Sequence, residues 1–343
     1  MTESRLQSLI KGKNVIYITV KNLDYIRTSQ IQRLLVDNAG KFTIYSSEKN
    51  NLFLRTIDIK RKIKHIDISG YEVVIAGFLP QLIWNDIKKL LKNTKIKPVI
   101  IAEMFLSLYD TIVCDRKVVL KNGLISKWCK NKDIEVVSEA DLVVTDTKAD
   151  AEYFCKEFAG QSKNKKTIFE HLYLEADKGY VPGLIDTSDN TVVRLVHKNR
   201  VLYFGSGIPL QGTGYVVDAM KLLAEDYGFD CVYIGGTKGL TFRQKKFLYS
   251  NSITYYNHLP QKDLYNQIYL SDICLAGHFN PDIDKADRTI PGKAYIYELC
   301  DKKIILGDTK ANHEIFNTDS KHVFVKRGSS KAIVEAVIKM KSR

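Results

Sequence analysis

The feature that most constrains this chain is its repeated alternation of short apolar runs with longer amphipathic stretches. Runs typical of buried strands occur in the first half at residues 14–20, 42–45, 72–76, 99–103, 141–145 and 167–170. A second set follows at residues 201–204, 231–234, 253–256, 273–276, 304–306 and 323–325. Strands that alternate with helices form βαβ units, so the sequence predicts an α/β fold built on parallel sheets.

The helices that this pattern predicts lie at 26–37, 81–92, 148–158, 213–226, 241–249, 261–270, 291–300, 311–316 and 330–341. Residues 55–66 are basic and fit neither pattern. From 180 to 200 the chain is rich in Pro, Gly, Ser, Asp and Asn, which indicates a domain boundary near 185–195. A chain of 343 residues suits two cores. We therefore expect Rossmann-like domains at 1–185 and 195–328, and a last helix at 329–343 that packs across their junction.

A basic stretch in the second half suggests a phosphate site. Lys285, Arg288 and Lys293 lie just before or within the predicted helix that Pro291 begins. The amino end of a helix carries free N–H groups and a partial positive charge, and therefore favours anions. Cations added at this position would strengthen the binding of a diphosphate. The alternative is a solvated basic loop before an ordinary helix.

Three segments resemble glycosyltransferase family 4. They are KADRTIPGKAYIYELCDKKIILGDTKANHEIF (285–316), VLYFGSGIPLQGTGYVVDAMKLL (201–223) and IIAEMFLSLYDTIVCDRK (100–117). The resemblance implies the GT-B fold, in which two Rossmann-like α/β domains face each other across a cleft. It also implies transfer of a sugar from a nucleotide diphosphate sugar with retention of anomeric configuration.

The glycine-rich turn GSGIPLQGTG follows a predicted strand and precedes a helix. It lacks the third glycine of a dinucleotide fingerprint and the lysine of a P-loop. The resemblance places Gly207 and Gln211 near the donor diphosphate. Many family members carry an arginine and a lysine in this turn, where this chain has Ser206 and Gln211. We expect the downstream cations Lys285, Arg288 and Lys293 to compensate for their absence; the alternative is weak donor binding.

The resemblance also implies a ribose contact. Family members often carry two carboxylates seven residues apart at the donor helix, and Glu298 matches the second of them. A carboxylate there is suited to accept hydrogen bonds from two ribose hydroxyls, whereas the alternative is an ordinary glutamate on a helix surface. The first carboxylate is replaced by Ile290, so the group that holds the sugar ring is not identified; Asp284 is a nearby substitute.

Two further sets of candidates come from strand ends. Tyr256, His258 and Leu259 follow a predicted strand where GT-B enzymes hold the nucleobase, although the tyrosine also suits a core and a lone histidine is more often structural. Glu103 ends another apolar strand, and the carboxyl ends of parallel strands face the ligand. The resemblance places Glu103 near the reacting sugar, where it would hold the acceptor hydroxyl or stabilise the transition state. Asp110 is the second catalytic candidate.

Two arginines of the first half are weaker candidates. Arg116 stands with Asp110 in the loop that follows Glu103. Arg27, early in the first predicted helix, could face the cleft, although we expect an ordinary surface arginine.

The formal net charge of +13 indicates an anionic partner. The helix from Leu82 to Lys95 is basic and amphipathic, with Trp84 as an interfacial aromatic residue, and residues 123–132 repeat the mixture. Such a helix can bind an anionic membrane, or it can face the core with a solvated basic back. RNA-binding motifs that interleave aromatic residues are absent, so we disfavour nucleic acid.

The sequence also bears on location. The chain has no apolar run of about 20 residues and no signal-peptide pattern at its start. Its six cysteines are scattered, without metal or redox spacing. These features favour a cytoplasmic protein, and the basic amphipathic helix would allow it to bind peripherally on the inner face of the membrane.

We therefore expect a metal-independent, retaining hexosyltransferase of polysaccharide or glycoconjugate biosynthesis. Its donor would be a nucleotide diphosphate sugar and its acceptor a glycan or lipid-linked glycan. Two alternatives stay open. One is a GT-B nucleotide-sugar epimerase, and the other is a basic, non-catalytic protein that binds nucleic acid or membrane.

Overall fold

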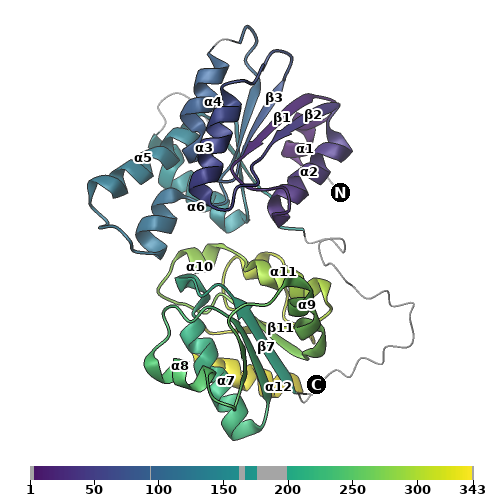
Figure 1. The fold of residues 1–343 in the computed structure, drawn as a ribbon, viewed down its shortest axis with the longest axis vertical. Helices are drawn as coiled ribbons and strands as arrows, with labels where there is room; N and C mark the ends of the chain where they lie inside the picture. Colours follow the sequence, from purple (N-terminus) through teal and green to yellow (C-terminus); the bar gives the residue numbers. More distant parts are fainter. Residues whose placement is uncertain (1–3, 93, 162–166, 176–198, 342–343) are drawn as a thin grey trace. The chain divides into compact units, whose positions relative to one another are not determined.

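The computed structural model describes residues 4–92, 94–161, 167–175 and 199–341. The chain divides into two compact units, Met1–Glu175 (unit 1) and Ala176–Arg343 (unit 2), and each contains a parallel sheet flanked by helices (Figure 1). The predicted fold class, two Rossmann-like α/β domains, is confirmed. The predicted boundary at 185–195 lies outside the described residues.

Unit 1 is built on six parallel strands in the order β2-β1-β3-β4-β5-β6. The strands are β1 (Asn14–Thr19), β2 (Lys41–Tyr45), β3 (Val73–Gly77), β4 (Val99–Glu103), β5 (Leu142–Thr145) and β6 (Ile168–His171). The helices are α1 (Arg5–Ile10), α2 (Ile26–Asn38), α3 (Leu52–Ile63), α4 (Trp84–Leu91), α5 (Leu124–Glu139) and α6 (Lys148–Phe158), with short turns at Pro80–Leu82, Asp110–Asp115 and Ala159–Gln161. The strand order reverses between β1 and β3, the kind of position at which open α/β sheets bind ligands.

Unit 2 repeats this plan with the order β12-β11-β10-β7-β8-β9. Its strands are β7 (Arg200–Gly205), β8 (Asp230–Gly235), β9 (Thr254–Tyr256), β10 (Ile273–Gly277), β11 (Lys303–Gly307) and β12 (His322–Val325). Its helices are α7 (Thr213–Tyr227), α8 (Phe242–Leu248), α9 (Gln261–Leu270), α10 (Lys285–Arg288), α11 (Gly292–Leu299) and α12 (Ser330–Lys341), with 3₁₀ turns at Pro209–Gln211 and Asn312–Glu314. Its order reverses between β7 and β10.

Helices cover both faces of each sheet, which explains why the strands are apolar along their length. In β1, Val15 and Tyr17 belong to one buried cluster, whereas Ile16 and Ile18 belong to another on the opposite face. A strand with two buried faces needs no polar alternation. The continuous apolar runs of the sequence therefore predicted the strands well.

The final helix packs within its own unit. α12 contacts α7, β11 and β12. Its predicted packing across the domain junction stays a prediction.

The basic stretch at 55–66 belongs to a helix. α3 runs from Leu52 to Ile63, and the Asn51 side chain caps it by accepting a hydrogen bond from Leu54 N at 2.9 Å. Ile59 and Ile63 are buried, so the basic residues form its outer face.

The structure corrects the interpretation of Leu82 to Lys95 as a membrane-binding helix. Its apolar side faces the core of unit 1, where Trp84 is 1% exposed and Ile87 is fully buried. The indole N–H of Trp84 donates to Glu139 at 2.7 Å, and Lys88 pairs with Glu135 at 2.6 Å. This helix therefore presents no apolar face to a bilayer, and the interpretation of Trp84 as interfacial is wrong.

Candidate active site

Lys293, in the first turn of α11, places a buried ammonium at the carboxyl edge of the unit 2 sheet. Its Nζ lies 4.2 Å from the centre of the Tyr203 ring. Among the described residues the buried Nζ finds no hydrogen-bond partner. Burial lowers the pKa of Lys293 to about 7, because the charged form loses its hydration. Within the described part of the chain this ammonium has no counterion, and an anionic ligand would supply one.

The ammonium reaches the end of β7 because Gly205 has no side chain. A Cβ on Gly205 would lie 3.0 Å from Lys293 Nζ and 2.6 Å from Gln211 Oε1. Gln211 Oε1 accepts hydrogen bonds from the Tyr203 hydroxyl at 2.9 Å and from Gly207 N–H at 3.1 Å. Gly207 has a φ of 69°, which glycine adopts without strain. Lys293 thus meets the glycine turn that contains Gly207 and Gln211.

His278 is the residue directly after β10, the strand next to β7, and it lies close enough to Lys293 for the charge to act on its ring. The imidazole is buried, and its Nδ1 has no hydrogen-bond partner in the described part of the chain. Burial and the charges of Lys293, Lys285 and Arg327 lower the pKa of His278 well below its usual value. The ring is therefore neutral near pH 7, and it can exchange a hydrogen bond with a ligand without adding charge.

Lys285 and Arg288 form a helical turn of their own, α10, rather than crowding the first turn of α11. Both side chains are buried. Pro291 is the N-cap of α11, with extended backbone at ψ 124°, so the predicted first helical residue is one position too early. Ala294 N donates to Pro291 O at 2.8 Å and starts the helix.

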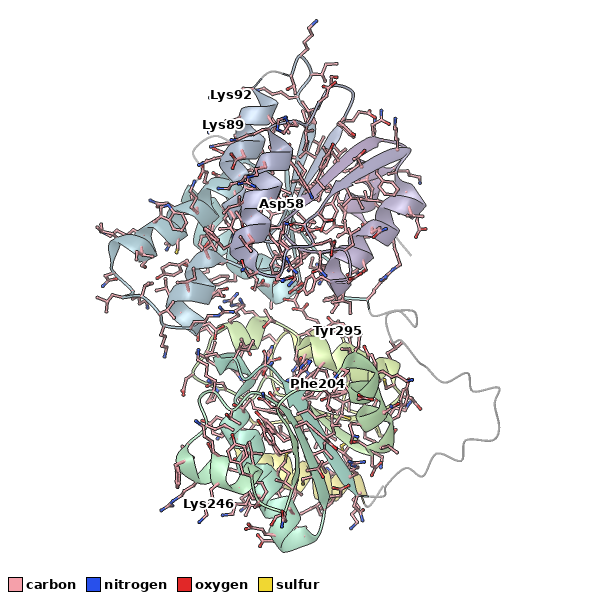
Figure 2. All side chains as sticks on the ribbon, in the orientation of Figure 1. Asp58, Lys89, Lys92, Phe204, Lys246 and Tyr295 are labelled. Carbon is pink, nitrogen blue, oxygen red and sulfur yellow. The ribbon has the colours of Figure 1, made fainter. Side chains whose placement is uncertain are left out.

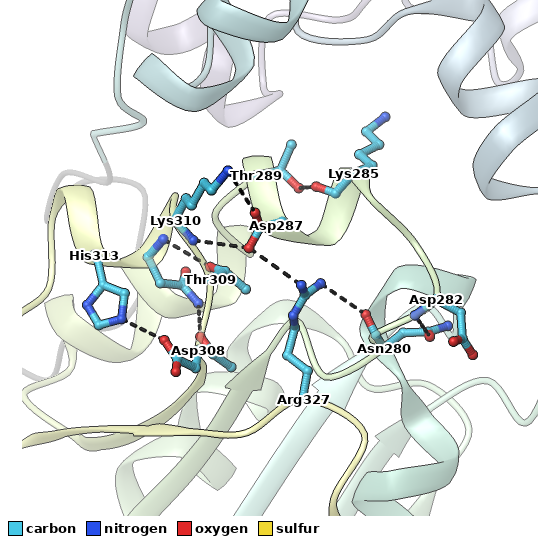
Figure 3. Close-up of polar contacts among 12 residues, drawn as sticks. Asn280, Asp282, Lys285, Asp287, Thr289, Asp308, Thr309, Lys310, His313 and Arg327 are labelled. Carbon is cyan, nitrogen blue, oxygen red and sulfur yellow. Dashed lines mark hydrogen bonds and ion pairs between the residues drawn. The ribbon is translucent and has the colours of Figure 1, made fainter.

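A polar clamp holds α10 in place (Figure 3). The carboxylate of Asp287 accepts from Lys310 N at 3.2 Å and pairs with Arg327 Nη2 at 3.5 Å. Arg327 also donates to Asn280 O at 3.3 Å. Lys310 follows β11 and Arg327 follows β12, so two strand ends meet at the Asp287 carboxylate, and Arg327 links Asn280, which follows β10, to them. The clamp fixes the chain that carries Lys285 and Arg288 relative to the sheet.

The proposed nucleobase segment lies at the end of β9. Tyr256 and Leu259 are half-buried and pack against the cluster that contains Ala294 and Tyr297 of α11. His258 is exposed. Tyr256 and Leu259 therefore share a hydrophobic cluster with the helix that carries Lys293, and base binding by this segment stays a prediction.

Glu298 lies near the other end of α11. Its Oε2 is 2.7 Å from Nε2 of His322, the first residue of β12, and His322 Nδ1 contacts Asp319 at 3.1 Å. α11 thus leads from the carboxyl edge, where Lys293 lies, toward the amino edge of the sheet. Ribose binding by Glu298 stays a prediction. The carboxylate that would bind the ribose already contacts His322.

The residue that replaces the first family carboxylate is part of the core. Ile290 packs against the same cluster as Tyr256 and Leu259. Asp284, the suggested substitute, is an exposed N-cap of α10.

Glu103 is a buried carboxylate at the carboxyl end of β4 in unit 1. Its Oε2 accepts from the Tyr17 hydroxyl and from Phe78 N–H, each at 3.1 Å. Its Oε1 is buried with no hydrogen-bond partner in the described residues. Burial raises the pKa of Glu103 to about 7, against the lowering effects of the Phe78 N–H and the Arg27 charge. Such a carboxyl is poised to exchange a proton near neutral pH.

Arg27 is buried, which corrects the expectation of a surface arginine. It pairs with Asp146 at 2.5 Å and donates to Gln30 Oε1 and Leu172 O, each at 2.7 Å. Its guanidinium lies 4.3 Å from the centre of the Phe105 ring. Arg27 therefore ties α2 to the ends of β4, β5 and β6, and its charge acts on Glu103.

Asp133 of α5 anchors the loop that follows Glu103. This fully buried carboxylate accepts from Ser107 Oγ at 2.6 Å and from Gln81 Nε2 at 2.7 Å. It also accepts from the backbone N–H groups of Leu108 at 3.0 Å and Tyr109 at 2.9 Å. The anchored loop leads directly into buried Asp110, whereas Arg116 lies exposed at the end of the same π-helical turn.

Sequence reasoning missed His278, Arg327 and Asp133. His278 lies two residues after the apolar run 273–276, and a polar residue at the end of such a run is the signal that identified Glu103. Arg327 follows the last strand in the same way. Asp133 gave no such signal, because it sits in mid-helix among lysines. Metal ligands are not grouped in the described residues, where no cluster of three or more His, Cys, Asp or Glu suits an ion.

Comparison with solved structures identifies the fold as GT-B. Sucrose-phosphate synthase from Thermosynechococcus elongatus superposes with a TM-score of 0.65 at 10% identity, over 96% of this chain and 90% of that chain. A glycosyltransferase from Rickettsia africae gives 0.62 at 14% identity, over 96% and 88%. HepE from Anabaena, in complex with UDP-glucose, gives 0.59 at 10% identity, over 95% and 89%. The sequence matches no protein-family model and no curated protein. The expectation of the GT-B fold is confirmed.

Proposed function

We propose that this protein is a glycosyltransferase whose donor is a nucleotide diphosphate sugar. The observation that carries the proposal is the buried ammonium of Lys293, which has no counterion among the described residues and lies against the glycine turn at the end of β7. A diphosphate at this turn would supply that counterion through a charge-assisted hydrogen bond. The HepE complex with UDP-glucose supports testing uridine donors first.

Lys293 would act most strongly on the leaving group. Negative charge grows on the diphosphate as the bond to the sugar breaks, and a fixed cation in a dry site stabilises that charge without reorganisation. Lys285 and Arg288 supply further positive charge from α10. We propose that these cations, rather than a metal ion, neutralise the diphosphate in place of the family cations missing at Ser206 and Gln211.

Glu103 is the proposed catalytic carboxylate of unit 1. A carboxyl whose pKa is near 7 can accept a proton from an acceptor hydroxyl at working pH. We propose a glycan or lipid-linked glycan as acceptor and retention of configuration, as the resemblance to family 4 implies. Asp110 follows on the loop that Asp133 anchors and is the second candidate.

Product analysis tests this function. Purified protein would be incubated with radiolabelled UDP-, GDP-, ADP-, CMP- and dTDP-sugars, with and without glycan acceptors. A glycosyltransferase releases the nucleotide and moves the label to the acceptor. An epimerase would instead convert the nucleotide sugar without any acceptor. Loss of turnover in Lys293→Met, but not in Lys246→Met, would link the reaction to the proposed site; Figure 2 shows Lys246 on α8, far from Phe204 of β7.

A further inference from the structure

One segment of unit 1 combines apolar and basic residues in a way that sugar transfer does not require. Residues 116–132, RKVVLKNGLISKWCKNK, contain six lysines and arginines and no acidic residue. They connect the π-helical turn Asp110–Asp115 to the first half of α5. In Figure 1 the start of α5 lies at the outer margin of unit 1.

The apolar side chains of this segment are unusually exposed. Leu124 is 86% exposed, Leu120 84%, Val118 67%, Ile125 58% and Trp128 51%. Large apolar residues scattered singly over a surface are common, but a group this dense marks an interaction site.

Four of these side chains, those of Leu120, Leu124, Ile125 and Trp128, form one preformed patch. Leu124 and Trp128 are one helical turn apart, and Ile125 is adjacent. The opposite face of α5 is fixed to the core through Ser126, Cys129 and Asp133, which are buried.

The loop before α5 is folded onto the helix start. Gly123 N donates to Leu120 O at 3.0 Å, and the Ser126 hydroxyl donates to Lys121 O. These bonds hold Leu120 beside the first turn of α5. The patch is therefore built without any need for ordering on binding.

Exposed cations surround the apolar side chains. Arg116, Lys117, Lys121 and Lys127 are all exposed. Lysine stems extend along apolar surface while their ammonium groups reach a polar boundary. The last two cations of the segment are used within the fold instead, since Lys130 lies 3.7 Å from Glu157 and Lys132 lies 2.6 Å from Glu135.

We infer that residues 116–128 dock on the surface of an anionic lipid bilayer. The apolar side chains would enter the headgroup boundary, Trp128 would lie at the interface, and the surrounding cations would contact lipid phosphates. A nucleic acid would satisfy the cations but would leave the apolar side chains in water. Docking is peripheral, because no helix in the described chain is both long and apolar enough to span a bilayer. The inference does not rest on the proposed function.

Trp128 provides a direct readout in the full chain. The protein has two tryptophans, and Trp84 is 1% exposed. A blue shift of emission on adding vesicles therefore reports on Trp128. Vesicles of phosphatidylcholine with about one third phosphatidylglycerol would be compared with phosphatidylcholine alone, by emission and by co-sedimentation, at roughly physiological salt.

Two patch variants and two matched controls complete the design. The apolar variant is Leu124→Ser with Ile125→Ser, and the charge variant is Lys117→Gln with Lys121→Gln and Lys127→Gln. The apolar control is Phe53→Ser with Phe242→Ser, two residues 73% and 82% exposed elsewhere. The charge control is Lys89→Gln with Lys92→Gln on α4 (Figure 2). Circular dichroism confirms that each variant is folded.

The inference predicts that wild-type protein binds the anionic vesicles with a blue shift. Each patch variant should weaken binding by about tenfold or more, whereas both controls should bind as wild type does. Three outcomes would overturn it: no binding to anionic vesicles, binding that survives loss of Leu124 and Ile125, or a stable dimer in solution that the apolar variant dissociates.

Discussion

At the scale of single residues, Lys293 and Glu103 are two buried ionisable groups whose pKa values shift in opposite directions. Burial disfavours the charged form of each, so the pKa of the lysine falls and the pKa of the carboxyl rises. Each also has a polar atom without a hydrogen-bond partner among the described residues. Such groups cost stability, which is a common signature of sites built for a ligand or a reaction.

The lowered pKa of Lys293 makes nucleotide binding depend on pH. The free protein has a pKa of about 7 at this ammonium, and a bound diphosphate would raise it. Binding above pH 7 therefore takes up a proton, and the affinity should fall by about tenfold per pH unit above pH 7. Calorimetric titration of the nucleotide between pH 6.5 and 9 measures this slope. Lys293→Arg should flatten it, because arginine stays charged; an unchanged slope would assign the proton to another group.

The lowered pKa of Lys293 also makes the free energy of unfolding depend on pH. Between pH 7 and the ordinary lysine value near 10.4, the unfolded chain binds the proton and the folded chain does not. The contribution of Lys293 to the free energy of unfolding therefore rises with pH across that window. Urea denaturation of wild type and Lys293→Met at several pH values should show this rise only in the wild type.

Glu103→Gln tests the catalytic carboxylate. The amide keeps an acceptor for the Tyr17 hydroxyl and Phe78 N–H, so the fold should be retained. Turnover should fall by about a hundredfold or more, since the variant cannot take up a proton. The dissociation constant of the nucleotide should stay within about twofold, because this role is exercised in the transition state. Steady-state kinetics and titration measure the two effects; equal losses in both would remove Glu103 from catalysis.

At the scale of elements, α5 holds the loop that follows Glu103. Asp133 accepts four hydrogen bonds, three from that loop and one from Gln81, with two at each carboxylate oxygen. Asp133→Asn replaces one of these oxygens by an NH₂ group and therefore breaks two of the four. We expect a loss of about 2–4 kcal/mol in the free energy of unfolding. Urea denaturation measures it. The control Glu152→Gln, on the exposed side of α6, should change stability by less than about 0.5 kcal/mol; a similar small effect of Asp133→Asn would show that the loop needs no such anchor.

Helices and strands were predictable from sequence where the residues that define them are neighbours in the chain. Each predicted strand is present because a strand buried on both faces is apolar throughout. The helix α5 was recognised only in its first part, because polar Asp133 interrupts the apolar face. Burial of Arg27 escaped prediction, since its partners Asp146 and Leu172 lie more than a hundred residues away in sequence. Trp84 was misassigned because a helix that faces the core and one that faces a bilayer share one periodicity.

The candidate site was predictable to a similar extent. Lys293, Gly207 and Gln211 were singled out from motif and position, and the structure brings them to one turn. Glu298 was singled out because it matches the second family carboxylate, and such a match does not reveal that His322 contacts the carboxylate. His278 and Arg327 needed the strand order, which places the ends of β7, β10, β11 and β12 along one edge.

At the scale of the whole molecule, the cations behind the net charge of +13 lie in different environments. Some cations are buried at the unit 2 edge, some are paired within the fold, as Lys88 is with Glu135, and some surround the apolar patch at the start of α5. A net charge therefore indicates an anionic partner without locating it. Location comes from burial and pairing, which only the fold defines.

The central claim is that a nucleoside diphosphate binds at Lys293, and calorimetric titration of UDP into three proteins tests it most directly. The account predicts that wild type and Lys246→Met bind equally and that Lys293→Met binds at least tenfold more weakly, about 1.4 kcal/mol. Lys293→Met should also be as stable as wild type or more so, because it removes a buried cation. Uridine without phosphates should not distinguish the three proteins. Equal UDP affinity in Lys293→Met and Lys246→Met would contradict the account.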